Sequence, residues 1–319
     1  MQLLGAFFRM IRWSNLVFIA LTQCLFHFCV VMPSAIGTRF SFPLQLNTHL
    51  FILLCLSSVL IAAAGYVIND YFDINIDQVN KPERMVVEKV ISRRWALVWH
   101  LILSGLGIAI GVYLSLMMHN WFLAIANTAC VVLLWYYSTS YKRRLLVGNV
   151  LISALTAWVI LVLLVAELPG WWSGSINDPL ERITAARLAR IGILYSGFAF
   201  IISLVREVVK DIEDMDGDHR NGCRTMPIVW GITPTKIFAA VWLVVLIAAV
   251  FISQLYVIQF GWWFSIIYIG FLVLAPLLMV FRKLLKANAV EHYSQLSREI
   301  KVVMLSGILS MLFFLHYSQ

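Results

Sequence analysis

The sequence predicts an all-α integral membrane protein in which nine transmembrane helices surround a central cavity. Of its 319 residues, 61% are hydrophobic and only 13% are charged, and the mean hydropathy is +0.87. Ordinary soluble domains carry about 25% charged residues, so the composition excludes that class. The chain also contains repeated apolar segments long enough to cross about 30 Å of hydrocarbon.

A first apolar run at Leu16–Met32 follows Arg9 and Arg12 and so resembles a secretory signal. No convincing cleavage site follows the run, and further apolar segments come after it, so we interpret it as a membrane anchor. We expect residues 1–319 to form a single membrane domain. The nine helices are predicted over residues 16–32, 49–70, 96–117, 121–138, 147–167, 188–209, 236–257, 262–281 and 300–316.

Lys and Arg collect at the N-terminus and in alternate connections, at 71–95, 139–146, 206–235 and 282–299. The positive-inside rule then predicts a multi-pass protein of the plasma (inner) membrane with its N-terminus in the cytoplasm and its C-terminus outside. The net charge is +8, but the basic residues lie between apolar spans. This distribution favours lipid or phosphate partners over nucleic acid. The two longest inner loops, about 71–95 and 206–235, are expected to form a cytoplasmic cap.

Two sets of three aspartates stand at the ends of apolar segments with the same spacing. On a helix this spacing places each set on one face. Oxygen ligands without nearby His or Cys suit a hard cation, and Mg²⁺ in particular, although a solvated helix end is the plainer alternative. The predicted metal ligands are Asp70, Asp73, Asp77, Asp211, Asp214 and Asp218, followed by Asn80 and Asn221 at matching positions.

Basic and amide side chains near the aspartates are candidates for binding phosphate. Arg binds phosphate oxygens in a bidentate manner and Lys acts as a point charge. The basic residues could equally be ordinary positive-inside residues, and the amides within helices could simply form interhelical hydrogen bonds. The predicted substrate-binding residues are Asn15, Asn69, Lys81, Arg84, Lys142, Asn149, Arg206, Lys210 and Arg224.

Asn15 and Asn149 precede the two aspartate sets in corresponding helices, which suggests either an internal duplication or a chance match. An enzyme acting on a lipid diphosphate would use both sets, because Mg²⁺ would stabilise the departing diphosphate while the tail lies among apolar helices. An ion-coupled secondary transporter is a second hypothesis, but such proteins place their acids near the midplane on broken helices. A non-catalytic scaffold would leave the aspartates unused.

Two longer motifs resemble the signatures of the UbiA superfamily of intramembrane prenyltransferases. They are Asn69-Asp70-x-x-Asp73-x-x-x-Asp77 with Asn80-Lys81-Pro82-x-Arg84, and Asp211-x-Glu213-Asp214-x-x-Gly217-Asp218 with Gly222, Thr225 and Pro227. The resemblance implies nine helices and two Mg²⁺ ions held by the six aspartates. It also implies an isoprenyl diphosphate donor whose allylic cation a lipophilic acceptor captures. Under this resemblance the catalytic residues are Asp73, Asp214 and Lys142.

The stretches 74–77 and 91–94 most resemble the branch that alkylates geranylgeranylglyceryl phosphate in making ether lipid. Aromatic acceptors such as hydroxybenzoate or dihydroxynaphthoate remain the alternative. One departure concerns the family's Tyr-x-x-x-Lys pattern, because Tyr137 and Lys142 are one residue too far apart. Whether Tyr137 or Tyr141 has a catalytic role is therefore left open.

Overall fold

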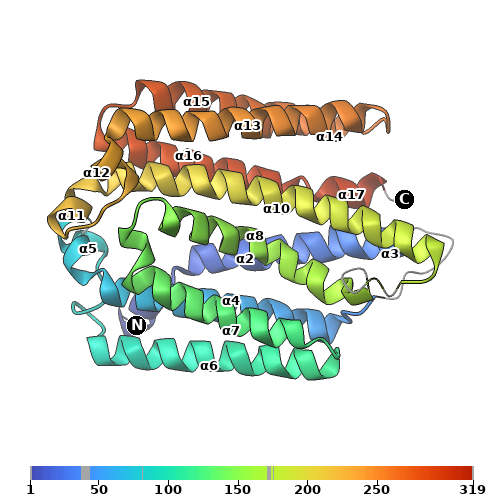
Figure 1. Ribbon diagram of the computed structural model, residues 1–319, viewed down its shortest axis with the longest axis horizontal. Helices are drawn as coiled ribbons and strands as arrows, with labels where there is room; N and C mark the ends of the chain where they lie inside the picture. The colour runs from blue at the N-terminus through green and yellow to red at the C-terminus, as the bar shows by residue number, and fades with distance from the viewer. Residues whose placement is uncertain (1, 37–43, 81, 171–173, 175, 318–319) are drawn as a thin grey trace.

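The computed structural model describes residues 2–36, 44–80, 82–170, 174 and 176–317. Over these ranges the chain is helical apart from turns, connections and one isolated bridge between Val87 and Ile91. Nine helices in these ranges are long and apolar enough to cross a membrane. They run side by side along one axis of the molecule, and the two ends of the chain lie at opposite ends of this bundle (Figure 1). The predicted number and type of spans are confirmed.

The first five spans are close to their predicted positions. The first contains a π-helical stretch, η1 (Phe26–Val31), between α2 and α3. These spans are built from α2 (Trp13–Leu25) with η1 and α3 (Met32–Ile36), α4 (Thr48–Phe72), α6 (Arg93–Met117), α7 (Trp121–Thr139) and α8 (Val147–Glu167).

The later spans extend further than hydropathy predicted. The remaining helices are α10 (Pro179–Glu213), α13 (Ile232–Ile258), α14 (Trp263–Ile269) with η4 (Gly270–Leu274) and α15 (Ala275–Lys286), and α16 (Val290–Leu309) with α17 (Leu312–Tyr317). Helix α10 begins nine residues before the predicted start at 188. The Asp178 side chain caps it by accepting a hydrogen bond from the Leu180 N–H, and Pro179 occupies the first helical position.

The predicted cap loops contain short helices. After α4 come α5 (Ile74–Asn80) and η2 (Pro82–Arg84), and after α10 come α11 (Met215–Arg220) and α12 (Met226–Trp230). The first residues of the predicted 206–235 loop still belong to α10, because that helix continues to Glu213. Helices α5 and α11 lie beside each other at one end of the bundle (Figure 1).

Close packing between α4, α6 and α7 holds the helix that leads to the first aspartate motif. A Cβ atom at Gly107 would lie 2.7 Å from Cγ1 of Ile61, so only glycine permits this approach of α6 to α4. The Ser57 hydroxyl donates to the Gly107 carbonyl (2.9 Å) and accepts from Nδ2 of Asn127 (3.0 Å). Small residues and interhelical hydrogen bonds of this kind hold helices together within lipid.

Candidate active site

The two aspartate motifs meet at one end of the bundle, and the side chain of Asn80 joins them. Its Nδ2 donates to the Asp214 carbonyl (3.0 Å), and its Oδ1 accepts from the Gly217 N–H (2.9 Å). A Cβ atom at position 217 would lie 2.4 Å from Oδ1 of Asn80, so this junction requires glycine. Two stretches that are distant in sequence therefore form one polar site.

Both motifs have their middle aspartate at a break between two helices. Helix α4 ends at Phe72 and α5 begins at Ile74, with Asp73 between them at φ −90° and ψ 0°. Asp214 separates α10 from α11 with almost the same backbone angles, φ −95° and ψ 6°. The i, i+3, i+7 spacing was expected to place each set on one helical face. That expectation was wrong for the last aspartate of each set, which stands on the second, shorter helix.

The carboxylates of the first motif already have partners in the protein. Asp70 Oδ1 accepts a hydrogen bond from Nη2 of Arg12 at 2.7 Å. Asp73 Oδ2 accepts one from Nδ2 of Asn69 at 2.6 Å, while Asp73 Oδ1 contacts the ammonium of Lys142. Asp73 is buried. Lys142 thus contacts the first motif, even though its spacing from Tyr137 in the sequence is one residue longer than in the family pattern.

In the second motif, Asp211 Oδ2 accepts a hydrogen bond from Nδ2 of Asn149 at 2.8 Å. One turn earlier, the buried carboxylate of Glu207 contacts Nζ of Lys210 at 2.9 and 3.0 Å. Nη1 of Arg206 lies 3.4 Å from the same carboxylate. Asn221, the counterpart of Asn80, donates from Nδ2 to the Gly217 carbonyl at 2.8 Å and so stays within its own motif.

The other predicted substrate-binding residues are placed differently. Asn15 does not bind the first motif in the way that Asn149 binds the second, because its Oδ1 accepts from Nζ of Lys301 (2.7 Å). Arg224 is exposed, and its backbone N–H donates to the Arg143 carbonyl (2.8 Å). Lys81 lies outside the described residues, and the position of the Arg84 side chain is likewise not described, so their roles stay predictions.

Three residues of the site escaped the sequence analysis, namely Arg12, Glu207 and Lys301. Arg12 was interpreted only as part of the basic N-terminus that sets the orientation. Glu207 and Lys301 lie within otherwise apolar helices, α10 and α16. A signal was available for these two, because an ionisable residue inside a membrane span is costly and usually functional.

Burial changes the chemistry of two side chains beside the motifs. Burial lowers the pKa of the Lys142 ammonium to about 7, and the positive charge of Arg143 acts in the same direction. The negative charge of Asp218 opposes this effect by stabilising the charged ammonium. Burial raises the pKa of the Cys223 thiol, and the charge of Asp218 adds to that rise, so this cysteine is not an activated nucleophile.

The donor atoms present suit Mg²⁺ better than a softer metal. Within the described ranges, no three His, Cys, Asp or Glu side chains converge as a complete protein cage. Mg²⁺ commonly takes one or two carboxylates together with waters and substrate phosphates, so partial sets of this kind fit it. The buried Oδ1 of Asn69 has no hydrogen-bond partner among the described residues and adds one more hard oxygen beside Asp73.

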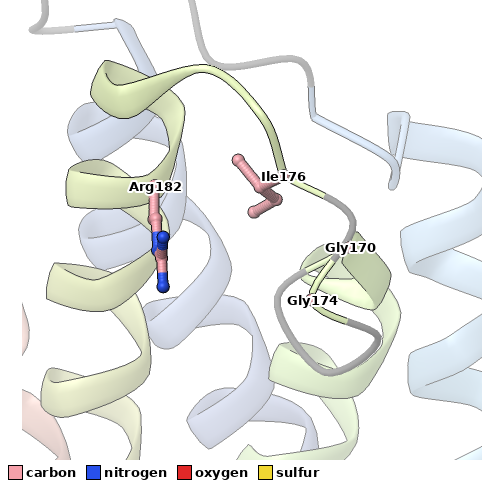
Figure 2. Close-up of a pocket in the computed structure, with 4 residues that line it drawn as sticks. All are labelled: Gly170, Gly174, Ile176 and Arg182. Atoms are coloured by element: carbon pink, nitrogen blue, oxygen red, sulfur yellow. The ribbon is translucent and has the colours of Figure 1, made fainter.

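A cavity of about 240 Å³ lies at the other end of the bundle, lined by Gly170, Gly174, Ile176 and Arg182 (Figure 2). Arg182 stands in the first turns of α10, whereas Asp211 stands near its last residue. At 1.5 Å of rise per residue the two are about 43 Å apart along the helix. The cavity is therefore separate from the aspartate site.

The fold is that of a polytopic membrane protein. Its two aspartate motifs form one site of ionisable side chains where α4 and α10 end. Residues 30–298 match the UbiA prenyltransferase family, and the chain belongs to this family. It is therefore a prenyltransferase, and membership favours the enzyme over the transporter and scaffold hypotheses.

Similar proteins include digeranylgeranylglyceryl phosphate synthases and a UbiA homolog. A digeranylgeranylglyceryl phosphate synthase from Methanothermobacter thermautotrophicus is 34% identical over 247 residues, 76% of each chain. One from Sulfolobus acidocaldarius is 33% identical over 298 residues, 93% of each chain. A solved structure described as a digeranylgeranylglyceryl phosphate synthase aligns with a TM-score of 0.63 at 26% identity, over 98% of this chain and 99% of that one. A UbiA homolog from Archaeoglobus fulgidus, bound to GPP and Mg²⁺, shares the fold with a TM-score of 0.53 at 15% identity, over 96% and 99%.

Proposed function

We propose that this prenyltransferase transfers an isoprenyl group from its diphosphate to geranylgeranylglyceryl phosphate, a step in making ether lipid. The junction of the two aspartate motifs through Asn80 carries the proposal, because it gives one diphosphate two acidic motifs to bind through metal. The relatives support this acceptor. They are described as digeranylgeranylglyceryl phosphate synthases, and the chain matches them over most of their length.

The aspartates would hold two Mg²⁺ ions, with Asp73 and Asp214 central because each lies at the break between two helices. Bound Mg²⁺ would neutralise the diphosphate and make it a better leaving group. Lys142 would bind the diphosphate from its place beside Asp73, while Asn69 and Asn149 orient the carboxylates that they contact. The proposed ligands are Asp70, Asp73, Asp77, Asp211, Asp214 and Asp218, and Lys81, Arg84, Lys210 and Arg224 are proposed to bind phosphate oxygens.

The reaction requires one bond to break and one to form at C1 of the donor. The bond from C1 to the diphosphate oxygen breaks, the acceptor hydroxyl oxygen bonds to C1, and the departing diphosphate takes up the hydroxyl proton. The chain's contribution is to hold the two substrates together and to keep water from C1. Apolar helices around the prenyl tail would exclude water, which otherwise competes with the acceptor.

We place the site on the cytoplasmic side of the plasma membrane, with the N-terminus inside and the C-terminus outside. Basic residues at the aspartate end of the bundle support this orientation, and so do chain ends that lie at opposite ends of the bundle (Figure 1). Membrane lipid would surround the helices. Labelling of single cysteines at Arg224 and Asp178 in intact cells tests this, since only position 178 should react with an impermeant reagent.

The function is tested with purified protein, a labelled prenyl diphosphate and three acceptors, namely geranylgeranylglyceryl phosphate, hydroxybenzoate and dihydroxynaphthoate. We expect a product only with the first, only in the presence of Mg²⁺, and none from Asp73→Ala or Asp214→Ala protein that elutes normally in detergent. An aromatic product would contradict the acceptor assignment. Unimpaired turnover by either alanine variant would contradict the site.

A further inference from the structure

A lysine that pairs with no carboxylate of the described residues lies inside the last membrane span. Lys301 is eleven residues beyond the start of α16, or about 16 Å along the helix. Its Nζ donates to Oδ1 of Asn15 at 2.7 Å and lies 5.0 Å from the ring centroid of Phe18. Among the described residues no carboxylate forms an ion pair with it. An ammonium has three donors, and a neutral amide accepts only one of them.

Four helices bring further polar groups to this lysine. Tyr66 of α4 hydrogen-bonds Asn15 of α2 and lies within electrostatic range of Arg206. Arg206 of α10 donates from Nε to the carbonyl of Ser297 (3.4 Å), one turn before Lys301 on α16. The charges of Arg206 and Lys301 are close enough to repel each other. Like charges held together in this way favour an anion that binds between them.

The side chains around Lys301 and Arg206 carry a net positive charge. Glu207 is the carboxylate that Arg206 contacts, and Lys210 takes both of its oxygens at 2.9 and 3.0 Å. Outside the aspartate motifs, Arg206, Lys210 and Lys301 provide three positive charges, and Glu207 provides one negative charge. Arg12 does not add to this surplus, because it is paired with Asp70. The surplus of two positive charges matches a phosphate monoester, which carries about −1.5 to −2 at neutral pH.

The excess positive charge of Lys301 and Arg206 also lies close to the aspartate motifs, where a second substrate must bind. Asn15 is one turn from Arg12, which binds Asp70, and Arg206 is five residues before Asp211. In a glyceryl phosphate only a few bonds separate the phosphorus from the reacting hydroxyl, so its phosphate must bind next to the donor's diphosphate. In the proposed function, Lys142 beside Asp73 provides the cation for the donor's diphosphate.

We propose that Lys301 and Arg206 bind the phosphate group of the acceptor and thereby select a phosphorylated glyceryl ether over its free alcohol. This assignment rests on the proposed function, since it presupposes a phosphorylated acceptor. Asn15 is a positioning residue in this arrangement, because its amide oxygen holds the lysine side chain in place.

The experiment compares two acceptors, geranylgeranylglyceryl phosphate and the dephosphorylated geranylgeranylglycerol, in the wild-type protein and in Lys301→Gln. Glutamine can keep the hydrogen bond to Asn15 but carries no charge. We expect the KM for the phosphorylated acceptor to rise by roughly tenfold or more, the factor for one charge-assisted hydrogen bond. The KM for the donor and the kcat/KM for the alcohol should stay unchanged. Lys301→Arg should keep most of the preference for phosphate.

Lys286→Met is the matched control, since Lys286 is an exposed lysine at the end of α15 and should leave every constant unchanged. A rise in the donor KM instead of the acceptor KM would assign the site to the donor's diphosphate and overturn the proposal. Equal losses with both acceptors would show a structural role and also overturn it. If the wild-type protein alkylates neither acceptor, the proposed function itself fails, which is a separate result.

Discussion

Oδ1 of Asn80 accepts a hydrogen bond from the backbone N–H of Gly217 at 2.9 Å, across a separation of 137 residues. The contact joins α5 to α11, the short helices that carry the last aspartate of each motif. Because both helices follow a break in a membrane span, this bond holds the two halves of the site at a fixed separation. The relative position of the motifs therefore depends on a side chain that forms hydrogen bonds with backbone groups of the opposite motif.

Gly217→Ala should disable the enzyme without unfolding it. The added Cβ would lie 2.4 Å from Oδ1 of Asn80, so the two short helices must separate. We expect a fall in kcat/KM of roughly fivefold to 150-fold, since roughly 1–3 kcal/mol is lost when a buried hydrogen-bonding group is unsatisfied. Steady-state kinetics in detergent measures this fall. Gly105→Ala is the control, because no atom lies within 4 Å of a Cβ there, and activity equal to the wild type in both variants would contradict the role of the junction.

Sequence reasoning recovered the spans because nine apolar stretches are long enough to cross a membrane. It misplaced the start of α10, since the first turns of that helix hold polar residues and carry no hydropathy signal. It identified the aspartates from their spacing but missed the breaks at Asp73 and Asp214, because backbone angles at a single residue are set by tertiary contacts. The pairing of Asn80 with Gly217 was not predictable, because no local pattern specifies which loops meet.

Lys142 and Asp73 should be coupled in stability but not in activity. Their side chains are only 11% and 13% exposed, so removing one leaves the other buried and uncompensated. Lys142→Met should therefore lower the free energy of unfolding by about 3 kcal/mol. The double variant Asp73→Leu with Lys142→Met should recover much of that loss, while both variants release no diphosphate.

The denaturation midpoint in Mg²⁺-free detergent solution measures this coupling, alongside a diphosphate-release assay. Lys89→Met is the control, because Lys89 is an exposed lysine that donates to the Pro82 carbonyl. A double variant that is no more stable than Lys142→Met alone would show that the pair is not coupled.

Arg12→Gly should separate the role of this residue in the backbone from its role in the site. Arg12 lies between α1 (Gln2–Met10) and α2 with φ 51° and ψ 53°, a left-handed conformation that costs a non-glycine residue about 1 kcal/mol. Glycine relieves that cost but removes the partner of Asp70 at 2.7 Å. We therefore expect little net change in the denaturation midpoint, because the relieved backbone cost offsets the lost ion pair, together with a roughly tenfold lower turnover. Arg9→Gln should change neither quantity, and a fall in stability without a fall in turnover would show that Arg12 serves only the helix junction.

At the opposite end of the bundle, Glu167 joins a connecting segment to the last turn of α8. Its Oε2 accepts hydrogen bonds from the N–H groups of Gln45 (2.9 Å) and Leu46 (3.4 Å), and its Oε1 lies 3.6 Å from Nδ1 of His27. Glu167→Ala leaves the buried N–H of Leu46, and that of Gln45, without this acceptor and should cost about 1–3 kcal/mol of stability. Glu167→Gln keeps one amide oxygen as acceptor and should cost less.

Neither change at Glu167 should alter the KM values or kcat, because the aspartate site lies at the other end of α8 and is reached only through a full membrane span. Thermal denaturation in detergent and steady-state kinetics on the same preparations measure the two effects. The exposed Glu291 provides the control, since Glu291→Ala removes a carboxylate that faces solvent. A large fall in kcat with an unchanged denaturation midpoint would show instead that the two ends of the bundle are coupled.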